Sequence, residues 1–288
     1  MSTEPDYVQI YKDLSEKFRQ RAWTAPDNSY LNVFDFAYEI VNKKPNVIER
    51  LALEYVYGGT VFNPHYTDLV RFSKGSGSGF RNGSINVYQE PHFDFNLISS
   101  LSMDKITAIN INYKISNPDP NIKNTIVMLN RQQGKSWLCA MIMAYEIYKR
   151  IVCMEARFGP QKQTLYDALS KDLIGGVGGF LYVCPTKEQC GFFRNFWNKF
   201  IEQSVYLQHK IKEHKIDVKC EIPSILRGMS GLHFCSSFID DADEFVRDQD
   251  DLLETIRIHS FKTFLTMSKT DGLRKVVTGK NFKYFETR

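Results

Sequence analysis

The chain has 288 residues, of which 43% are hydrophobic and 24% charged, a composition typical of a globular protein of one or two domains. Its formal charge of +4 permits a local nucleic-acid contact but excludes a histone-like binder. The six cysteines form no Cys-x-x-Cys pair, and no apolar run reaches the roughly 18 residues of a membrane span. These features exclude a zinc ribbon, a secreted disulfide scaffold and a membrane protein.

Residues 1–118 are predicted to form a largely helical N-terminal region. Three stretches carry apolar residues near helical spacing: Asp6–Trp23, Val33–Val41 and Val47–Tyr57. Ser73–Ser84 is dense in glycine and serine, which is typical of a mobile loop. It is either a plain surface loop or a basic finger that touches DNA or a partner. The turn cluster Asn117–Asn121 then marks a boundary, after which residues 119–288 are predicted to form a second unit.

From residue 122 onward, short apolar runs alternate with longer helical patterns. Four runs rich in Val, Ile and Phe predict strands: Thr125–Leu129, Phe180–Cys184, Leu232–Ile239 and Thr263–Met267. Two amphipathic patterns predict helices: Ser136–Val152 and Lys187–Ser204. Strands that alternate with helices in this way favour an α/β fold with a mainly parallel central sheet flanked by helices.

The stretch Leu129–Ser136 follows a predicted strand and opens a predicted helix, which is the context of a phosphate-binding loop. In such a loop, backbone N–H groups and the positive end of the helix bind the phosphates of a nucleotide. Gly134 would let the backbone approach them, Lys135 would reach the outer phosphates, and Ser136 would offer a hydroxyl to magnesium. Leu129 replaces the first glycine of common phosphate loops, so an ordinary strand-to-helix turn with an exposed lysine is the alternative.

Four acidic residues follow the predicted strand Leu232–Ile239: Asp240, Asp241, Asp243 and Glu244. A buried strand that ends in carboxylates is the second half of a nucleotide-hydrolysis site. Asp240 would hold the magnesium, and Asp241 would orient or deprotonate the attacking water. The acidic residues have a simpler alternative as the solvated first turn of a helix, where carboxylates are favourable.

Together these segments resemble the ATPase domain of a tailed-bacteriophage terminase large subunit, a motor that packages DNA. The loop of that family reads Ser/Thr-Arg-Gln-x-Gly-Lys-Ser/Thr, and Asn130–Ser136 here reads Asn-Arg-Gln-Gln-Gly-Lys-Ser. The resemblance covers residues 122–275 and implies a RecA-like P-loop fold. Asn130, Gln132 and Gln133 would then join Gly134, Lys135 and Ser136 in binding ATP. Arg131 corresponds to an arginine proposed to act on the γ-phosphate.

Three further segments resemble elements of that family in the same order: Leu181–Gln189, Leu226–Ser230 and Thr263–Gly272. In the last of them, the resemblance makes Ser268 and Thr270 residues that sense the γ-phosphate and relay hydrolysis to the DNA-gripping part. Where the family has Asp-Glu, this chain has two aspartates, so either Asp241 is the catalytic acid or Glu244 substitutes for it. Gln89 is a weak candidate for the glutamine that contacts adenine.

Contacts with DNA are expected from basic side chains after the second predicted strand. Lys187 and Arg194 are weak candidates, because a solvated helix face explains them equally well. Five aromatic residues near helical spacing are predicted to be mostly core rather than a base-stacking platform: Phe192, Phe193, Phe196, Trp197 and Phe200.

The function expected from the resemblance is a magnesium-dependent ATPase that moves double-stranded DNA into a viral procapsid, with ATP and Mg²⁺ as cofactors. It implies a small terminase subunit and a portal protein as partners, and a ring of five copies of the chain. The alternative is a chain that is monomeric in isolation. The protein would act in the host cytoplasm, transiently at the portal vertex of the procapsid, without a membrane. The family's C-terminal nuclease domain has no counterpart here. The alternatives are another P-loop helicase or translocase, or an inactive P-loop module for DNA binding or assembly.

Overall fold

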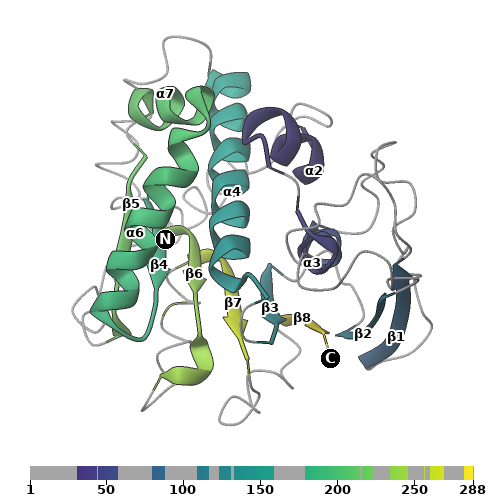
Figure 1. Ribbon diagram of the computed structural model, residues 1–288. Helices are drawn as coiled ribbons and strands as arrows, with labels where there is room; N and C mark the ends of the chain where they lie inside the picture. The colour runs from purple at the N-terminus through teal and green to yellow at the C-terminus, as the bar shows by residue number, and fades with distance from the viewer. Residues whose placement is uncertain are drawn as a thin grey trace, which may run out of the picture.

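The computed structural model describes the following residues: 31–43, 45–57, 80–87, 109–116, 123–130, 133–158, 179–214, 216–223, 234–245, 256, 260–268 and 282–287. Their strands form one sheet in the order β1-β2-β8-β3-β7-β6-β4-β5 (Figure 1). The strand bounds are Phe80–Val87 (β1), Ile109–Ser116 (β2), Asn124–Met128 (β3), Gly179–Val183 (β4), Val218–Glu221 (β5), Phe234–Ile239 (β6), Ser260–Met267 (β7) and Phe282–Thr287 (β8).

The six strands from β8 to β5 in this order are parallel to one another. At one edge β2 pairs antiparallel with β8, and β1 pairs antiparallel with β2. Because β7 lies between β3 and β6, the ends of the strands predicted to carry the phosphate loop and the aspartates are separated by one strand. This strand order and the mainly parallel pairing give the sheet of a RecA-like P-loop fold. In open α/β sheets, ligands bind at the carboxyl ends of the strands where the strand order reverses.

Three helices follow strands of the parallel part: α4 (Lys135–Phe158), α6 (Lys187–Glu202) and α7 (Val205–Glu213). Helix α6 begins with a capping box, in which the Thr186 hydroxyl accepts from the Gln189 N–H and the Gln189 side chain accepts from the Thr186 N–H. Ser204 caps α7 in the same sense, since its hydroxyl accepts from the Leu207 N–H. The first cap therefore fixes where the chain changes from β4 to α6, and the second where it changes direction between α6 and α7.

Two short segments of the N-terminal region pack beside the central helix. Val33–Asp35 (α2) continues into a π-helical turn, Phe36–Ile40, and Val47–Tyr57 forms α3. Tyr145 of α4 donates from its hydroxyl to the Leu31 carbonyl at 2.8 Å, and the Tyr55 hydroxyl of α3 accepts from the Tyr284 N–H of β8 at 2.9 Å. These bonds attach the N-terminal segments to both α4 and the sheet.

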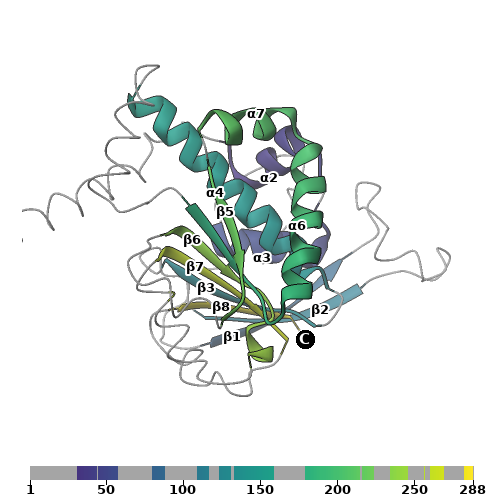
Figure 2. The same ribbon diagram turned by 90° about the vertical axis from the view of Figure 1, so that its left-hand side faces the viewer.

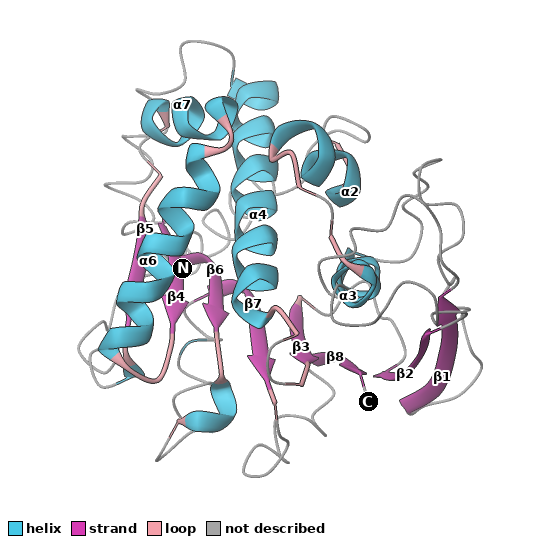
Figure 3. Ribbon diagram, in the orientation of Figure 1, coloured by secondary structure: helices cyan, strands magenta, loops and turns pink. Residues whose placement is uncertain are grey.

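The described α-helices lie on one face of the sheet, as the view in Figure 2 shows. Alternate strand residues therefore face two cores. In β3, Val127 packs with the helices, whereas Ile126 and Met128 belong to a second cluster on the other face. Helix α4 crosses the middle of the sheet and is buried along most of its length (Figure 3), which explains its nearly continuous apolar sequence. None of the helices in the described part has both the length and the apolar character needed to cross a membrane.

The α/β fold with a mainly parallel sheet is confirmed. All four predicted strands and both helices of its second half are present, and Val47–Tyr57 is helical as predicted. The prediction for Ser73–Ser84 was partly wrong, because Phe80–Ser84 belongs to β1. The N-terminal region also contributes β2, so the described residues on both sides of residue 118 share one sheet. The predicted helix Asp6–Trp23 lies outside the described residues.

Candidate functional site

The loop between β3 and α4 is closed by backbone and side-chain bonds. The Leu129 N–H donates to the Met267 carbonyl at 3.0 Å, which extends the pairing of β3 with β7 by one residue. The Asn130 N–H donates to Gln133 Oε1 at 2.9 Å, and the same oxygen accepts from the Thr287 hydroxyl at 3.0 Å. The Gln133 side chain thus holds the loop in shape and ties it to the end of β8. Arg131 and Gln132 lie outside the described residues.

Gly134 takes a backbone conformation that only glycine adopts easily, with φ at +82°. An added Cβ there would lie 2.6 Å from Oε1 of Glu49, a buried residue in the first turn of α3. Glu49 is itself held by a reciprocal cap, since its N–H donates to Asn46 Oδ1 and its Oε2 accepts from the Asn46 N–H. The N-terminal region therefore packs directly against the turn predicted to bind phosphates.

The two aspartates after β6 lie in different environments. Asp240 is 3% exposed, and its N–H donates to the Val183 carbonyl at 2.8 Å, continuing the pairing of β6 with β4. Asp241 is half-buried and takes a left-handed conformation with φ 48° and ψ 47°. This change of backbone direction turns the second carboxylate away from the first and toward the phosphate loop.

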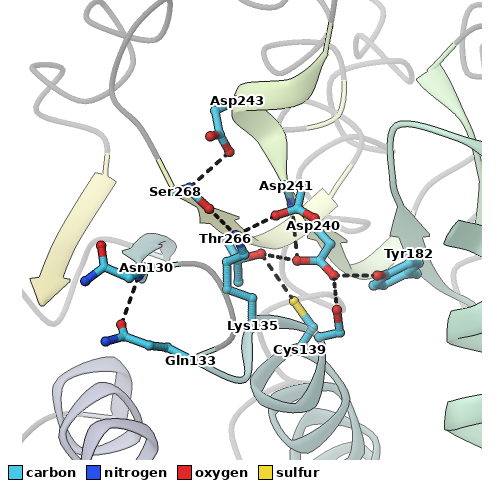
Figure 4. Close-up of polar contacts among 11 residues, drawn as sticks. Asn130, Gln133, Lys135, Cys139, Tyr182, Asp240, Asp241, Asp243, Thr266 and Ser268 are labelled. Atoms are coloured by element: carbon cyan, nitrogen blue, oxygen red, sulfur yellow. Dashed lines mark hydrogen bonds and ion pairs between the residues drawn. The ribbon is translucent and has the colours of Figure 1, made fainter.

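Both aspartates contact residues of the predicted phosphate loop (Figure 4). The Ser136 hydroxyl donates to Asp240 Oδ2 at 2.7 Å. Lys135 forms an ion pair with Asp241, in which Nζ lies 2.7 Å from Oδ1. The sequence separates these pairs by more than 100 residues, and the fold joins them because β3 and β6 end at the same edge of the sheet.

The carboxylate of Asp240 accepts four hydrogen bonds. Its Oδ2 accepts from Ser136 and from the Tyr182 hydroxyl, the latter at 2.7 Å. Its Oδ1 accepts from the Thr266 hydroxyl and from the Asp241 N–H. Three of the four donors are hydroxyl groups, and no cationic side chain among the described residues lies within ion-pair distance of Asp240.

Lys135 also links the loop to the segment after β7. Its ammonium group donates to the Ser268 hydroxyl, and the Ser268 N–H donates to Asp243 Oδ1 at 3.0 Å. The acidic segment and the predicted coupling residue therefore contact each other directly as well as through Lys135 (Figure 4). A movement of Lys135 would change the contacts of both.

The surroundings of Asp241 change the pKa of its carboxyl group. Burial raises the pKa of Asp241, the ion pair with Lys135 lowers it in part, and the negative charge of Asp240 adds to the rise. A carboxylate whose pKa lies above its usual value is a better proton acceptor, which suits a general base. Glu244, the other candidate, is exposed in the 3-10 turn Ala242–Glu244.

Several predicted residues are placed elsewhere or are not described. Lys187 and Arg194 lie on the exposed part of α6, where the Arg194 guanidinium donates to the Cys220 carbonyl at 3.0 Å. Gln89 and Thr270 lie outside the described residues, as does the segment Leu226–Ser230. Of the five aromatic residues of α6, Phe193, Trp197 and Phe200 are buried as predicted, whereas Phe192 is 74% and Phe196 36% exposed.

The structure adds residues that the sequence reasoning missed. Tyr182 and Thr266 lie inside predicted strands, and their hydroxyl groups bond to Asp240. Glu49 comes from a distant helix that packs on Gly134. Polar side chains within strongly apolar strands were the available signal, because buried hydroxyl groups require partners.

Comparisons with known proteins do not assign this chain to a family. No protein-family model matches the sequence, and no curated protein matches it either. Among solved structures, the HK97 bacteriophage large terminase aligns at a TM-score of 0.33 and 16% identity, covering 51% of this chain and 29% of the other. The yeast DEAD-box splicing factor Prp28 aligns at a TM-score of 0.38 and 15% identity, covering 58% and 42%. The Thermus phage P74-26 large terminase ATPase domain aligns at 0.35 and 10%, covering 58% and 76%.

This chain thus spans less than half the length of the HK97 terminase and of Prp28. At these TM-scores the similarities add nothing to the fold assignment, which rests on the strand order and the loop of this chain. The site is a P-loop site in geometry: a glycine turn between a strand and a helix, with a lysine and a serine that contact two aspartates at the end of β6, which is separated from β3 by one strand.

Proposed function

We propose that this chain is the magnesium-dependent ATPase part of a DNA-packaging motor of the terminase large-subunit type. The observation that carries the ATPase proposal is the double contact of the phosphate loop with the acidic strand end, Ser136 with Asp240 and Lys135 with Asp241. Those are the residue types, in that arrangement, that nucleotide hydrolysis requires.

Oxygen ligands suit the proposed metal. The Ser136 hydroxyl and Asp240 Oδ2 lie 2.7 Å apart, and hydroxyl and carboxylate oxygens are the ligands that Mg²⁺ prefers. Asp240 is buried without a cationic partner among the described residues, so its charge is available to a cation. Held by Ser136 and Asp240, a magnesium ion would supply positive charge against the negative charge that develops during phosphoryl transfer.

The residues of the chain would act in a simple order. Lys135 leaves Asp241 and turns to the outer phosphates, because a triphosphate offers it more negative charge. Asp241, relieved of its ion pair, orients a water molecule and accepts its proton. Lys135 at the same time releases the Ser268 hydroxyl. Nucleotide binding would therefore change the contacts of the segment that follows β7. Arg131 is proposed to approach the γ-phosphate from within the loop, and Glu244 is the reserve candidate for the base.

The motor role goes further than the site and has its own support. The order of motifs along the sequence resembles that of terminase ATPase domains, and Ser268 contacts both Lys135 and Asp243 as a coupling residue would. We therefore propose double-stranded DNA as the track, and a portal protein and a small terminase subunit as partners. We further propose a ring of copies, with five as the expected number, acting in the host cytoplasm at the portal vertex.

ATP turnover by the full chain tests both parts of the proposal. Lys135→Ala is expected to reduce turnover at least about 100-fold, whereas Lys199→Ala, an exposed lysine at the end of α6, leaves it unchanged. Blunt duplex DNA is expected to raise wild-type turnover without separating the strands. Turnover that survives Lys135→Ala would reject the ATPase. Robust strand separation in a displacement assay would favour a helicase over a packaging motor.

A further inference from the structure

Tyr182 lies beside the candidate metal-holding carboxylate, in the segment Leu181–Gln189, to which no role at the site has been assigned. It stands in β4, is 2% exposed, and donates from its hydroxyl to Asp240 Oδ2 at 2.7 Å (Figure 4). Its ring is stacked on Phe193 of α6, with ring centroids 3.4 Å apart and planes 5° from parallel. Strand and helix together therefore fix both the ring and the direction of its hydroxyl group.

The donors around Asp240 differ in how firmly they are held. Ser136 is exposed and has a short side chain, so its hydroxyl can rotate away from Asp240 toward a cation. Tyr182 and Thr266 are buried, and each holds a different oxygen of the carboxylate. If Ser136 turns away, Oδ2 still accepts from Tyr182 and Oδ1 from Thr266 and the Asp241 N–H, and the carboxylate keeps its orientation.

The hydroxyl of Tyr182 donates to a charged acceptor. A phenolic hydroxyl has one hydrogen to donate, and the hydrogen of Tyr182 is held by the Asp240 carboxylate. Hydrogen bonds to a charged carboxylate are about twice as strong as neutral ones. A fixed donor of this kind selects one orientation of the carboxylate before a cation arrives, and so lowers the entropic cost of binding it.

We propose that Tyr182 is a positioning residue for the metal: it holds the Asp240 carboxylate in the orientation that binds a divalent cation beside Ser136. This inference rests on the proposed function, and deepens it by naming the residue that orients Asp240. Tyr182 acts through Asp240 and does not itself touch the nucleotide.

The test measures metal binding directly. Mn²⁺ serves as the probe, and the loss of its free-ion electron paramagnetic resonance signal is titrated with the full chain in the presence of ADP. The same titration with ADP alone is subtracted, because ADP itself binds Mn²⁺. Tyr182→Phe keeps the ring and its stacking on Phe193 but removes the hydroxyl. We expect a roughly tenfold rise in the Mn²⁺ dissociation constant, a loss of the size reported for outer partners of metal ligands. Nucleotide affinity without metal is expected to change less than about twofold, since no phosphate contact is lost.

Tyr284→Phe is the matched control. Tyr284 is also a 2% exposed tyrosine of the sheet, and its hydroxyl donates to the carboxylate Glu286 Oε2 at 2.8 Å, outside the candidate site. This variant is expected to bind Mn²⁺ like the wild type. Phe193→Leu leaves the Tyr182 hydroxyl in place but removes its stacking partner, so a smaller rise of about threefold is expected. Thermal melting of each variant shows that it is folded.

The outcomes separate this role from the proposed function. An unchanged Mn²⁺ affinity in Tyr182→Phe, beside normal binding by the wild type, rejects the positioning role and leaves the ATPase proposal standing. An equal loss in Tyr284→Phe rejects it too, because the effect would then be a general one on the sheet. A wild-type chain that binds neither ADP nor Mn²⁺ overturns the proposed function and this role with it.

Discussion

Helix α4 carries one buried carboxylate, Glu146, and contacts another, Asp240, and the two have different kinds of partner. At its first turn, Ser136 donates to Asp240, which is surrounded by hydroxyl and N–H donors. About three turns later, Glu146 is held between two ammonium groups, with Lys149 Nζ 2.6 Å from Oε1 and Lys262 Nζ 3.0 Å from Oε2. Glu146 also accepts from the Tyr57 hydroxyl at 2.9 Å.

The pKa of Glu146 shows how complete its neutralisation is. Burial alone would raise this pKa, but the two lysines outweigh burial and lower the pKa to about 2. Such a group is charged throughout the stable pH range, and it already has cationic partners. Burial lowers the pKa of one of them, Lys149, to about 7, so the pairing is complete below neutral pH. Asp240 has donors but no cationic partner among the described residues, and therefore keeps a charge that a cation can neutralise. The contrast distinguishes the structural ion cluster around Glu146 from the candidate binding site around Asp240, although α4 takes part in both.

Removal of the structural carboxylate is the largest expected effect on stability. Glu146→Ala leaves two ammonium groups without their buried partner, which costs about 3 kcal/mol, at the lower end of the usual range because Lys262 is 24% exposed. The control is Glu155→Ala on the same helix, which breaks partly exposed pairs with Lys210 and His214 and is expected to cost about 1 kcal/mol or less. Urea denaturation measures both. A loss below 1 kcal/mol in Glu146→Ala would contradict the structural role.

Removal of the charge at the site should affect binding more than stability. Asp240→Asn leaves no cation without a partner, but its amide nitrogen cannot accept the bonds that one carboxylate oxygen accepts, so the free energy of unfolding is expected to fall by about 1–2 kcal/mol. Magnesium–nucleotide affinity should fall about 100-fold, or about 2.7 kcal/mol. Asp241→Asn is the contrasting variant, which spares binding but stops turnover, because it removes the proposed base. Nucleotide titration and turnover measured on both variants decide the assignment, and an equal loss of binding in the two would contradict it.

A substitution at Gly134 tests whether this position of the loop tolerates a side chain. Gly134→Ala places an L-residue at φ +82° and sets its Cβ 2.6 Å from Glu49 Oε1, so it is expected to lose about 1–3 kcal/mol of stability and to weaken nucleotide binding. Gly191→Ala on α6 has open space around the new Cβ and is expected to be neutral or slightly stabilising. Adding Glu49→Ala to Gly134→Ala should relieve the clash but not the backbone strain. Full recovery in this double variant would mean that the positive φ costs nothing.

Local patterns account for what the sequence predicted. The strand Thr125–Leu129, the loop to Ser136 and the acidic end of β6 are each continuous in sequence, so composition and spacing reveal them. Elements without such a pattern were missed: β5 has four residues, two of them charged, and β8 mixes charged and aromatic residues.

Contacts across the sheet could not be predicted in the same way. The bond of Tyr182 to Asp240 joins residues 58 positions apart, and the contact of Glu49 with Gly134 depends on where α3 packs. The sequence indicates only that a buried hydroxyl or carboxylate needs a partner, and tertiary structure chooses which one. The ion pair of Lys135 with Asp241 is of this kind too, since the left-handed turn at Asp241 directs it.

A third buried carboxylate, Glu54, extends the comparison of Glu146 with Asp240 and gives the smallest expected change in stability. Glu54 of α3 is 5% exposed, and its Oε2 accepts no hydrogen bond from the described residues. Burial raises its pKa from 4.5 to about 7, and the charge of Arg50 offsets only part of the rise. Between these two pH values the folded protein keeps a proton that the unfolded chain loses. The free energy of unfolding therefore falls as the pH rises from about 4.5 to 7. Above pH 7 the destabilising contribution of Glu54 stays constant.

Glu54→Gln removes that charge and is expected to stabilise the protein by about 1 kcal/mol at pH 8, while flattening the pH dependence between pH 5 and 7. Glu202→Gln, an exposed glutamate at the end of α6, is the control and should change neither. Denaturation curves at several pH values provide the measurement. A Glu54→Gln variant that is less stable than the wild type at pH 8 would show that Glu54 is paired like Glu146, and that the difference between the two carboxylates is not one of neutralisation.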